Sequence, residues 1–248
     1  MLGRLTMISI ERGDIMEGIR KIKPFTYFIH ALVVFGFLGM EFGVLFVSRI
    51  IDGRSMEQLG SWPINWYGAI AHWVITIIVW GIGVAIYTRW AKRNGVFSEL
   101  ITFEFNIKVA KLTAAAVGIV VIMSLIQSQI YDISIPQLFR EYRGFRSMYG
   151  EHALIVTIFQ NIYYAFEMLL VLIMVVFFQR AGELWFKSSK VPWSSIGLMM
   201  TWGAIHFLSH PAGALGVTLW ALVPGLFYVY GGRYFYPVYV LLLLGFMI

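Results

Sequence analysis

The sequence contains no cysteine and few charged residues. Cysteine is absent from all 248 positions, and Asp, Glu, Lys and Arg together make up 13% of them. The absence of cysteine excludes disulfides, thiolate metal sites and cysteine nucleophiles. The low charge, together with a hydrophobic content of 59%, excludes an ordinary soluble domain. The composition therefore predicts a polytopic membrane protein.

Several sequence motifs of other protein classes are also absent. The chain has no G-x-S-x-G, H-E-x-x-H, Walker loop or glycine-rich nucleotide fingerprint. Its late apolar runs hold no lysine of the kind that a retinal Schiff base needs. The four-residue spacing of His206 and His210 does not suit a stack of two haems. The net charge of +6 is spread along the chain in a way that fits membrane topology better than nucleic-acid binding.

The apolar runs define the expected fold class, an all-α polytopic membrane protein. A helix needs about 20 apolar residues to cross a bilayer. Pro211 and Gly213 predict a tight turn, and Gly231, Gly232 and Pro237 break the chain before a short final run. We expect about seven transmembrane helices, the last ones short or broken, at 26–48, 66–88, 109–130, 153–178, 193–210, 213–230 and 235–248.

Two segments are expected to lie along the membrane surface. Residues 1–25 form an N-terminal segment with a helix-compatible mixture of apolar and charged residues. Residues 137–152 mix aromatic residues with arginine, as an interfacial amphipathic segment does. No repeat or soluble domain interrupts the chain, so we expect a single membrane domain over 1–248.

The distribution of basic residues predicts the orientation. With the N-terminus in the cytoplasm, the external basic residues are Arg49, Arg54, Arg140, Arg143 and Arg146, and the other 14 of the 19 lie inside. This bias follows the positive-inside rule. We expect an integral, multi-pass protein of a prokaryotic plasma membrane with a cytoplasmic N-terminus.

Six histidine and glutamate residues lie inside the predicted spans. Such residues are costly in hydrocarbon and often mark function. Against this stands a structural interpretation, in which Glu and His pairs only join helices; we favour it for Glu41 and His72, and place His30 at the cytoplasmic interface. The six are His30, Glu41, His72, Glu167, His206 and His210.

Glu167 is the centre of the predicted site. Asn161, Tyr164 and Glu167 follow one another at three-residue spacing and predict a polar stripe on one helix. At 1.5 Å per residue, His206 lies roughly 20 Å from the start of its span, a depth similar to that of Glu167. A carboxylate and an imidazole held together can activate water or bind a metal. A divalent metal at Glu167, His206 and His210 is therefore one expectation.

The C-terminal region resembles the CPBP family of intramembrane proteases, which process CAAX proteins and bacteriocins. Trp202-Gly-Ala-Ile-His206 is similar to the family's aromatic-xxx-His motif, and Glu167 lies where its Glu-Glu-xxx-Arg motif is expected. The stretch WGAIHFLSHPAGALGVTLWALVPGLFYVYGGRYFYPVYVLL carries the glycine and proline positions in fitting order. The resemblance covers residues 153–248.

This chain departs from the family pattern at three positions. Phe166 stands where the family has a second glutamate, Val171 stands at the arginine position, and Leu241 lies near the histidine of the last motif. The resemblance thus implies either an intramembrane endopeptidase or a degenerate pseudoprotease that acts as a partner subunit.

The family resemblance implies a role for each site residue. Glu167 would be the general base and His206 would stabilise the oxyanion, while His210 or Asn161 would orient the water. Tyr164 and Trp202 would line a cavity for a membrane-associated peptide, possible substrates being prenylated ones. The alternative is a transporter or channel-like protein whose buried Glu and His residues relay protons or hold a substrate.

Overall fold

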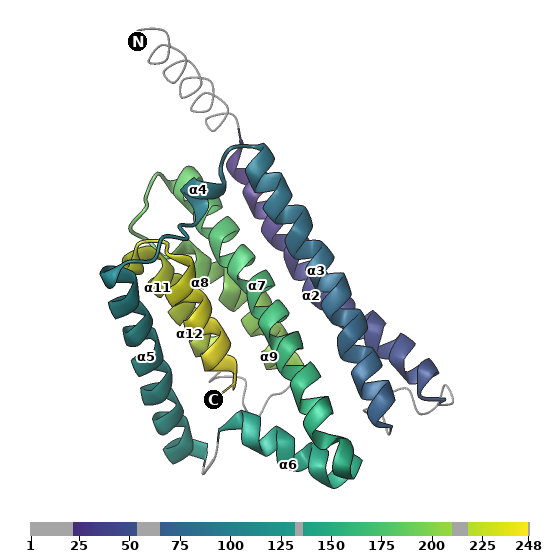
Figure 1. The fold of residues 1–248 in the computed structure, drawn as a ribbon. Coiled ribbons are helices and arrows are strands. Elements are labelled where there is room, and N and C mark those ends of the chain that lie inside the picture. The colour runs from purple at the N-terminus through teal and green to yellow at the C-terminus, as the bar shows by residue number, and fades with distance from the viewer. Residues whose placement is uncertain (1–21, 54–64, 132–135, 210–217, 248) are drawn as a thin grey trace, which may run out of the picture.

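The computed structural model describes residues 22–53, 65–131, 136–209 and 218–247, and these residues are almost entirely helical (Figure 1). The pairing of Thr102 with Tyr234 is an isolated β-bridge, and no strand forms within the described ranges. Four helical stretches are long and apolar enough to cross a membrane: Pro24–Ile51, Trp66–Arg93, Ile107–Ile126 and Gln137–Phe186. The molecule is an all-helical integral membrane protein.

The central element is α7 (Ala153–Phe186), the longest helix at 34 residues. It packs against α2 (Pro24–Ile51) and α3 (Trp66–Arg93) on one side. In Figure 1, α2 and α3 run side by side, with α7 between them and the C-terminal helices. Most of α7 is buried, which explains why its apolar run is nearly continuous rather than amphipathic.

Shorter helices complete the C-terminal part of the bundle. They are α8 (Trp193–Leu198), the π-helical turn η3 (Met199–Gly203), α9 (Ala204–Ser209), α11 (Leu222–Gly231) and α12 (Phe235–Met247). Helix α8 packs on α7 and α11, and α12 packs on α7 and on α5 (Ile107–Tyr131). Figure 1 shows α5 at the edge of the bundle, beside α12.

The predicted spans fall into two groups in the structure. The runs at 26–48, 66–88, 109–130 and 153–178 lie within α2, α3, α5 and α7. Of the later runs, α11 and α12 form apolar helices shorter than a full membrane span. The structure therefore provides four helices of spanning length, and the expected seven spans stay a prediction. Residues 1–21 of the expected N-terminal surface segment lie outside the described residues.

The surface segment expected at 137–152 is a helix followed by a short turn. Helix α6 covers Gln137–Tyr149 and a 3₁₀ turn, η2, covers Gly150–His152. Phe145 and Tyr149 are buried on the face of α6 that meets the bundle, while its three arginines, Arg140, Arg143 and Arg146, are exposed. In Figure 1, α6 lies across one end of the bundle. It also supplies a polar side chain to the site described below.

Polar side chains and one close approach hold α8 against α7. The Oε1 atom of Gln179 accepts from the Ser194 amide at 3.1 Å and from its hydroxyl at 3.2 Å. A Cβ atom at Gly197 would overlap the ring of Phe178, so only glycine allows this distance between the helices. These contacts fix the start of the α8–η3–α9 segment, which carries Trp202 and His206.

Candidate functional site

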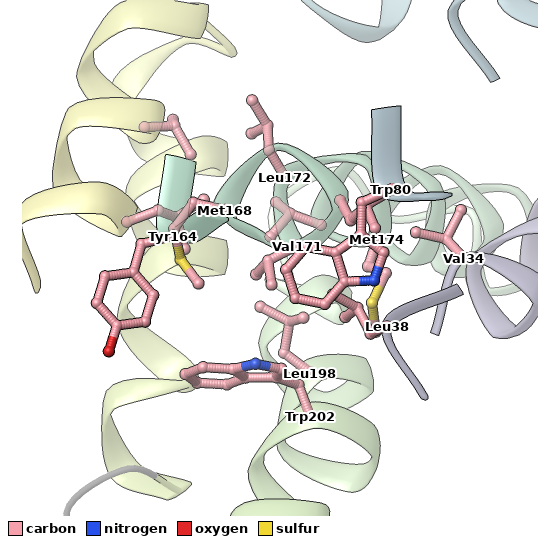
Figure 2. Packing of buried hydrophobic residues seen from close by; sticks show 14 of the residues in the cluster. Val34, Leu38, Trp80, Tyr164, Met168, Val171, Leu172, Met174, Leu198 and Trp202 are labelled. Carbon is pink, nitrogen blue, oxygen red and sulfur yellow. The ribbon is translucent and has the colours of Figure 1, made fainter. Parts of the chain in front are cut away.

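The site is centred on the contact between Glu167 of α7 and Trp202 of η3. Trp202 Nε1 donates a hydrogen bond to Glu167 Oε1 at 3.3 Å, across 35 residues of sequence. Glu167 is 6% exposed and Trp202 is 4% exposed, so both side chains are removed from solvent. Figure 2 shows the Trp202 indole extending below Tyr164 and Met168, two neighbours of Glu167 on α7. The indole N–H thus provides a hydrogen-bond donor, which a buried carboxyl group requires.

His206 lies one helical turn beyond Trp202 and contacts it twice. The two ring centroids are 4.4 Å apart, and His206 Nδ1 is 2.8 Å from the Trp202 carbonyl oxygen. Because a carbonyl oxygen can only accept, Nδ1 carries the hydrogen. A neutral His206 therefore has its lone pair on Nε2, where it can act as a base or a ligand. The oxyanion-stabilising role would require the doubly protonated imidazolium.

The π-helical turn η3 places Trp202 on the path between Glu167 and His206. It spans Met199–Gly203 and interrupts the α-helical hydrogen-bond pattern between α8 and α9. The Thr201 hydroxyl donates to the Gly197 carbonyl at 2.7 Å within the same turn. Single π-helical turns inside helices are frequent at functional sites, because the inserted residue changes which side chains face the neighbouring helix. Trp202 is 35 residues from Glu167 but faces it.

Tyr164 connects the site to α6. Its hydroxyl donates to Glu141 Oε1 at 2.7 Å and accepts from Gln160 Nε2 at 2.8 Å. Gln137 Nε2 donates to the same Glu141 oxygen at 2.8 Å. Each of these groups is partly or fully buried, so the bonds offset the cost of removing them from water. The surface helix α6 is therefore fixed to the bundle next to the site.

An aromatic residue near the end of α12 also borders the site. The Phe246 ring centroid is 4.8 Å from that of Tyr164 and 6.1 Å from that of Trp202. Figure 2 shows the Tyr164 phenol and the Trp202 indole on the same side of the packed core. Tyr164 and Trp202, two of the residues expected to line one site, thus share an aromatic neighbour.

A second polar cluster joins α2, α3 and α7 beside the site. Tyr163 donates to Glu41 Oε1 at 2.7 Å, and His72 Nε2 is 3.5 Å from the same oxygen. The expected contact between Glu41 and His72 across adjacent helices is present. Tyr163 lies one turn before Glu167 on α7. The two clusters are therefore neighbours along one face of α7.

The remaining predicted residues have different surroundings. Asn161 Nδ2 donates to the Thr157 carbonyl of its own helix at 2.7 Å. His30 lies among the aromatic rings of Tyr87, Trp90 and Phe177, with centroid distances of 5.3, 4.4 and 5.8 Å. His30, which was expected at the cytoplasmic interface, is thus packed between helices. His210 lies outside the described residues.

The three positions that depart from the family motifs are occupied by packed apolar side chains. Val171 and Leu241 are each 0% exposed in the hydrophobic core. The ring of Phe166 faces α3, where its nearest atom would be 3.2 Å from a Cβ built at Gly81. At Val171, one turn after Glu167 on α7, and at Leu241 the core therefore holds hydrocarbon where the family pattern has charged or polar groups.

The metal expected at Glu167, His206 and His210 stays a prediction. Within the described ranges, no three His, Asp or Glu side chains are grouped closely enough to hold a metal ion. Two of the three expected ligands, Glu167 and His206, both contact Trp202. The third lies beyond the described residues.

Sequence reasoning missed four residues of this region. Gln137, Glu141, Gln160 and Tyr163 contribute hydrogen bonds to the two clusters. Glu141 precedes the buried Phe145 by four residues and lies on the same face of the amphipathic α6, and Gln160 precedes Tyr164 by one turn of α7. Helical spacing from Phe145 and Tyr164 was the signal available for these two.

In comparisons with known proteins, no family model, no curated protein and no solved structure matches this chain. The resemblance to the CPBP family rests on the motif residues themselves.

Proposed function

We propose that this chain is a CPBP-like intramembrane protein that binds a membrane-associated peptide at the site formed by Glu167, Trp202 and His206. The observation that carries the proposal is the hydrogen bond from Trp202 to the buried Glu167 carboxyl group. It joins the two motifs on which the resemblance depends. His206, at the end of the aromatic-xxx-His motif, contacts Trp202 directly.

The chemistry of the site suits recognition of a peptide bond. The Glu167 carboxyl group can accept from a backbone amide, and His206 Nε2 offers a second polar atom. In a membrane, an extended peptide has unpaired backbone groups, and each is costly unless a partner satisfies it. A buried carboxyl and an imidazole among aromatic rings provide such partners.

Hydrolysis would use the same residues in a defined sequence. Glu167 would take a proton from water, and the resulting hydroxide would add to the peptide carbonyl carbon. Protonated His206 would hold the oxyanion until the C–N bond breaks and the proton passes to the leaving amine. With Val171 and Leu241 buried in the core in place of the family's further polar residues, the water would lack the orienting groups that the family pattern has at these positions. We therefore propose binding without efficient cleavage, as in a pseudoprotease or partner subunit.

The proposed arrangement in the membrane follows the charge distribution. We propose a multi-pass protein of a prokaryotic plasma membrane with about seven spans and a cytoplasmic N-terminus. The end of the bundle that carries Lys92, Arg93 and Lys190 is then cytoplasmic, and α6 with its arginines is external. The Glu167 site lies between these two ends.

The experiment is a cleavage assay with a fluorescent S-farnesylated peptide ending in a C-a-a-X sequence, reconstituted with the protein in liposomes. We expect product at the background rate for the wild type, for Glu167→Gln and for His206→Ala. A wild-type rate clearly above both variants would show that the protein is an active endopeptidase. Equilibrium binding of the same peptide to the three proteins then tests recognition separately from chemistry.

A second candidate function, proton-coupled transport, is favoured by the cluster beside the site. Glu41, His72 and Tyr163 are linked across three helices, and Tyr163 lies one turn from Glu167 on α7. Such chains of ionisable groups relay protons in transporters. Proton flux into proteoliposomes that falls in Glu167→Gln would support transport, whereas flux that is absent or insensitive to this substitution would count against it.

A further inference from the structure

A cavity of about 90 Å³ lies away from the Glu167 site, between α3, α4 (Phe97–Leu100), α7 and the start of α12. It is partly open, and its lining includes the half-buried Val84 and Ile173. Tyr87 and Thr88 supply its two hydroxyl groups, and its other lining residues are apolar. One water needs roughly 10–15 Å³ of such space, so the cavity can take several methylene groups of a hydrocarbon chain.

Stacked aromatic rings form one wall of this cavity. The Phe97 and Phe103 centroids are 5.5 Å apart, and those of Phe103 and Phe235 are 4.6 Å apart. Backbone bonds hold the two segments together, since the Phe235 amide donates to the Thr102 carbonyl at 2.8 Å. Phe103 is 43% exposed although it lies beside the cavity. Exposed aromatic rings at the end of a spanning helix are typical of the headgroup region of a bilayer.

Two lysines lie at the ends of the aromatic wall. Lys92 Nζ is 5.2 Å from the Phe97 centroid, and Lys108 Nζ is 5.4 Å from the centroid of Tyr234, the residue before Phe235. Both lysines are exposed. An ammonium group over an aromatic ring keeps donors available for a second partner. Two cations therefore lie at the ends of the aromatic wall that lines the cavity.

The surrounding charge is strongly positive. Glu104 is the exposed carboxylate of this region, and Glu99 is already paired with Arg180. Against Glu104 stand five exposed basic residues at the same end of α3 and α5: Arg89, Lys92, Arg93, Lys108 and Lys111. An anionic group at the mouth of the cavity thus meets a net positive field.

We propose that this cavity binds one acyl chain of an anionic phospholipid, whose headgroup is attracted by Lys92 and Lys108. Lipid tails are as apolar as leucine, so the chain gains dispersion contacts with the cavity wall rather than a hydrophobic driving force. Selectivity comes from the headgroup, since each basic residue near an anionic lipid contributes about a fivefold gain in affinity. The aromatic wall lies where the acyl chain of the lipid meets its headgroup.

The test is native mass spectrometry of the full chain released from bilayers of equal phosphatidylglycerol and phosphatidylcholine. We expect one phosphatidylglycerol retained per wild-type chain in preference to phosphatidylcholine. Val84→Phe fills the cavity and should abolish retention of either lipid. Lys92→Gln and Lys108→Gln should each lower the preference for phosphatidylglycerol by about fivefold and leave phosphatidylcholine retention unchanged.

Matched variants separate this site from general lipid contact. Ile78→Phe places the same side chain on an exposed position of α3, and Lys190→Gln removes an exposed lysine from the turn between α7 and α8; both should retain lipid as the wild type does. Equal retention of the two lipids by the wild type, or the same loss in Ile78→Phe as in Val84→Phe, would overturn the proposal. Glu167→Gln should bind the lipid normally, and its failure to do so would contradict a lipid site separate from the peptide site.

Discussion

Trp202 is the residue that makes the candidate site a single unit. Its indole N–H donates to Glu167 on α7, its carbonyl oxygen accepts from His206 Nδ1, and its ring lies against the His206 ring. The two ionisable residues are thus held relative to each other by the backbone and side chain of one residue. A substitution that removes the indole N–H therefore takes the hydrogen bond from Glu167 and leaves the backbone between Trp202 and His206 unchanged.

We expect Trp202→Phe to lower the free energy of unfolding by about 1–3 kcal/mol, the cost of leaving a buried acceptor without its donor. The measurement is a double-mutant cycle with Glu167→Leu, read as thermal unfolding in detergent. The loss of ring volume is the same in both backgrounds, so the coupling isolates the hydrogen bond. Additive effects of the two substitutions would show that the bond contributes nothing to stability.

The residues of the site differ in how well the sequence could predict them. Glu167 and His206 could be singled out because ionisable residues are rare inside apolar runs, and Trp202 because it lies one helical turn before His206 on the same face. Helical spacing from Phe145 places Glu141 on the buried face of α6, but its contact with Tyr164 could not be predicted, because a carboxylate in a polar surface segment is unremarkable until α6 folds onto α7. A tertiary contact between segments 23 residues apart leaves no signal in the sequence that names the partner.

At the scale of elements, the α8–η3–α9 segment decides where the site lies. Helix α8 approaches α7 closely at Gly197 and Phe178, and Ser195 Oγ donates to the Leu222 carbonyl of α11 at 2.6 Å. The π-helical turn follows at once. A shift of α8 away from α7 would carry Trp202 with it and separate it from Glu167.

Gly197→Ala should therefore destabilise the fold by about 1–3 kcal/mol, because the added methyl group overlaps the buried Phe178 ring. Gly118→Ala is the matched control: it lies within α5, and a Cβ there has nothing within 4 Å. This control should be neutral or stabilising by up to about 1 kcal/mol, since alanine favours a helix more than glycine does. Equal unfolding temperatures for Gly197→Ala and the wild type would contradict the close packing of α8 on α7.

The elements were predictable where the apolar runs were long. Helices α2, α3, α5 and α7 contain the four runs that reach spanning length without a break. The later segments were harder, because Pro224 lies inside the buried part of α11 and Gly232 ends that helix with a φ of 92°. Hydropathy detects their apolar character but not the packing on α7 and α8 that supports such short helices.

At the scale of the whole molecule, the absence of cysteine provides a direct test of orientation. A single introduced cysteine is the only thiol in the chain. Arg143 on α6 and Ser98 on α4 are both exposed, and the proposed topology places them on opposite sides of the membrane. We expect a membrane-impermeant maleimide to label Arg143→Cys in intact cells and Ser98→Cys only after lysis. The reverse pattern would mean that the N-terminus is external.

The central claim is that Glu167 belongs to a peptide-binding site, and one binding measurement tests it most directly. A fluorescent S-farnesylated peptide would be titrated against wild type, Glu167→Gln and Glu151→Gln in the same liposomes. Glu151 is the matched control, because its side chain is 87% exposed in the turn after α6. We predict saturable binding that weakens about tenfold in Glu167→Gln, the effect of losing about one hydrogen bond to the peptide, and is unchanged in Glu151→Gln. Binding that is absent, or the same in all three proteins, would contradict the account.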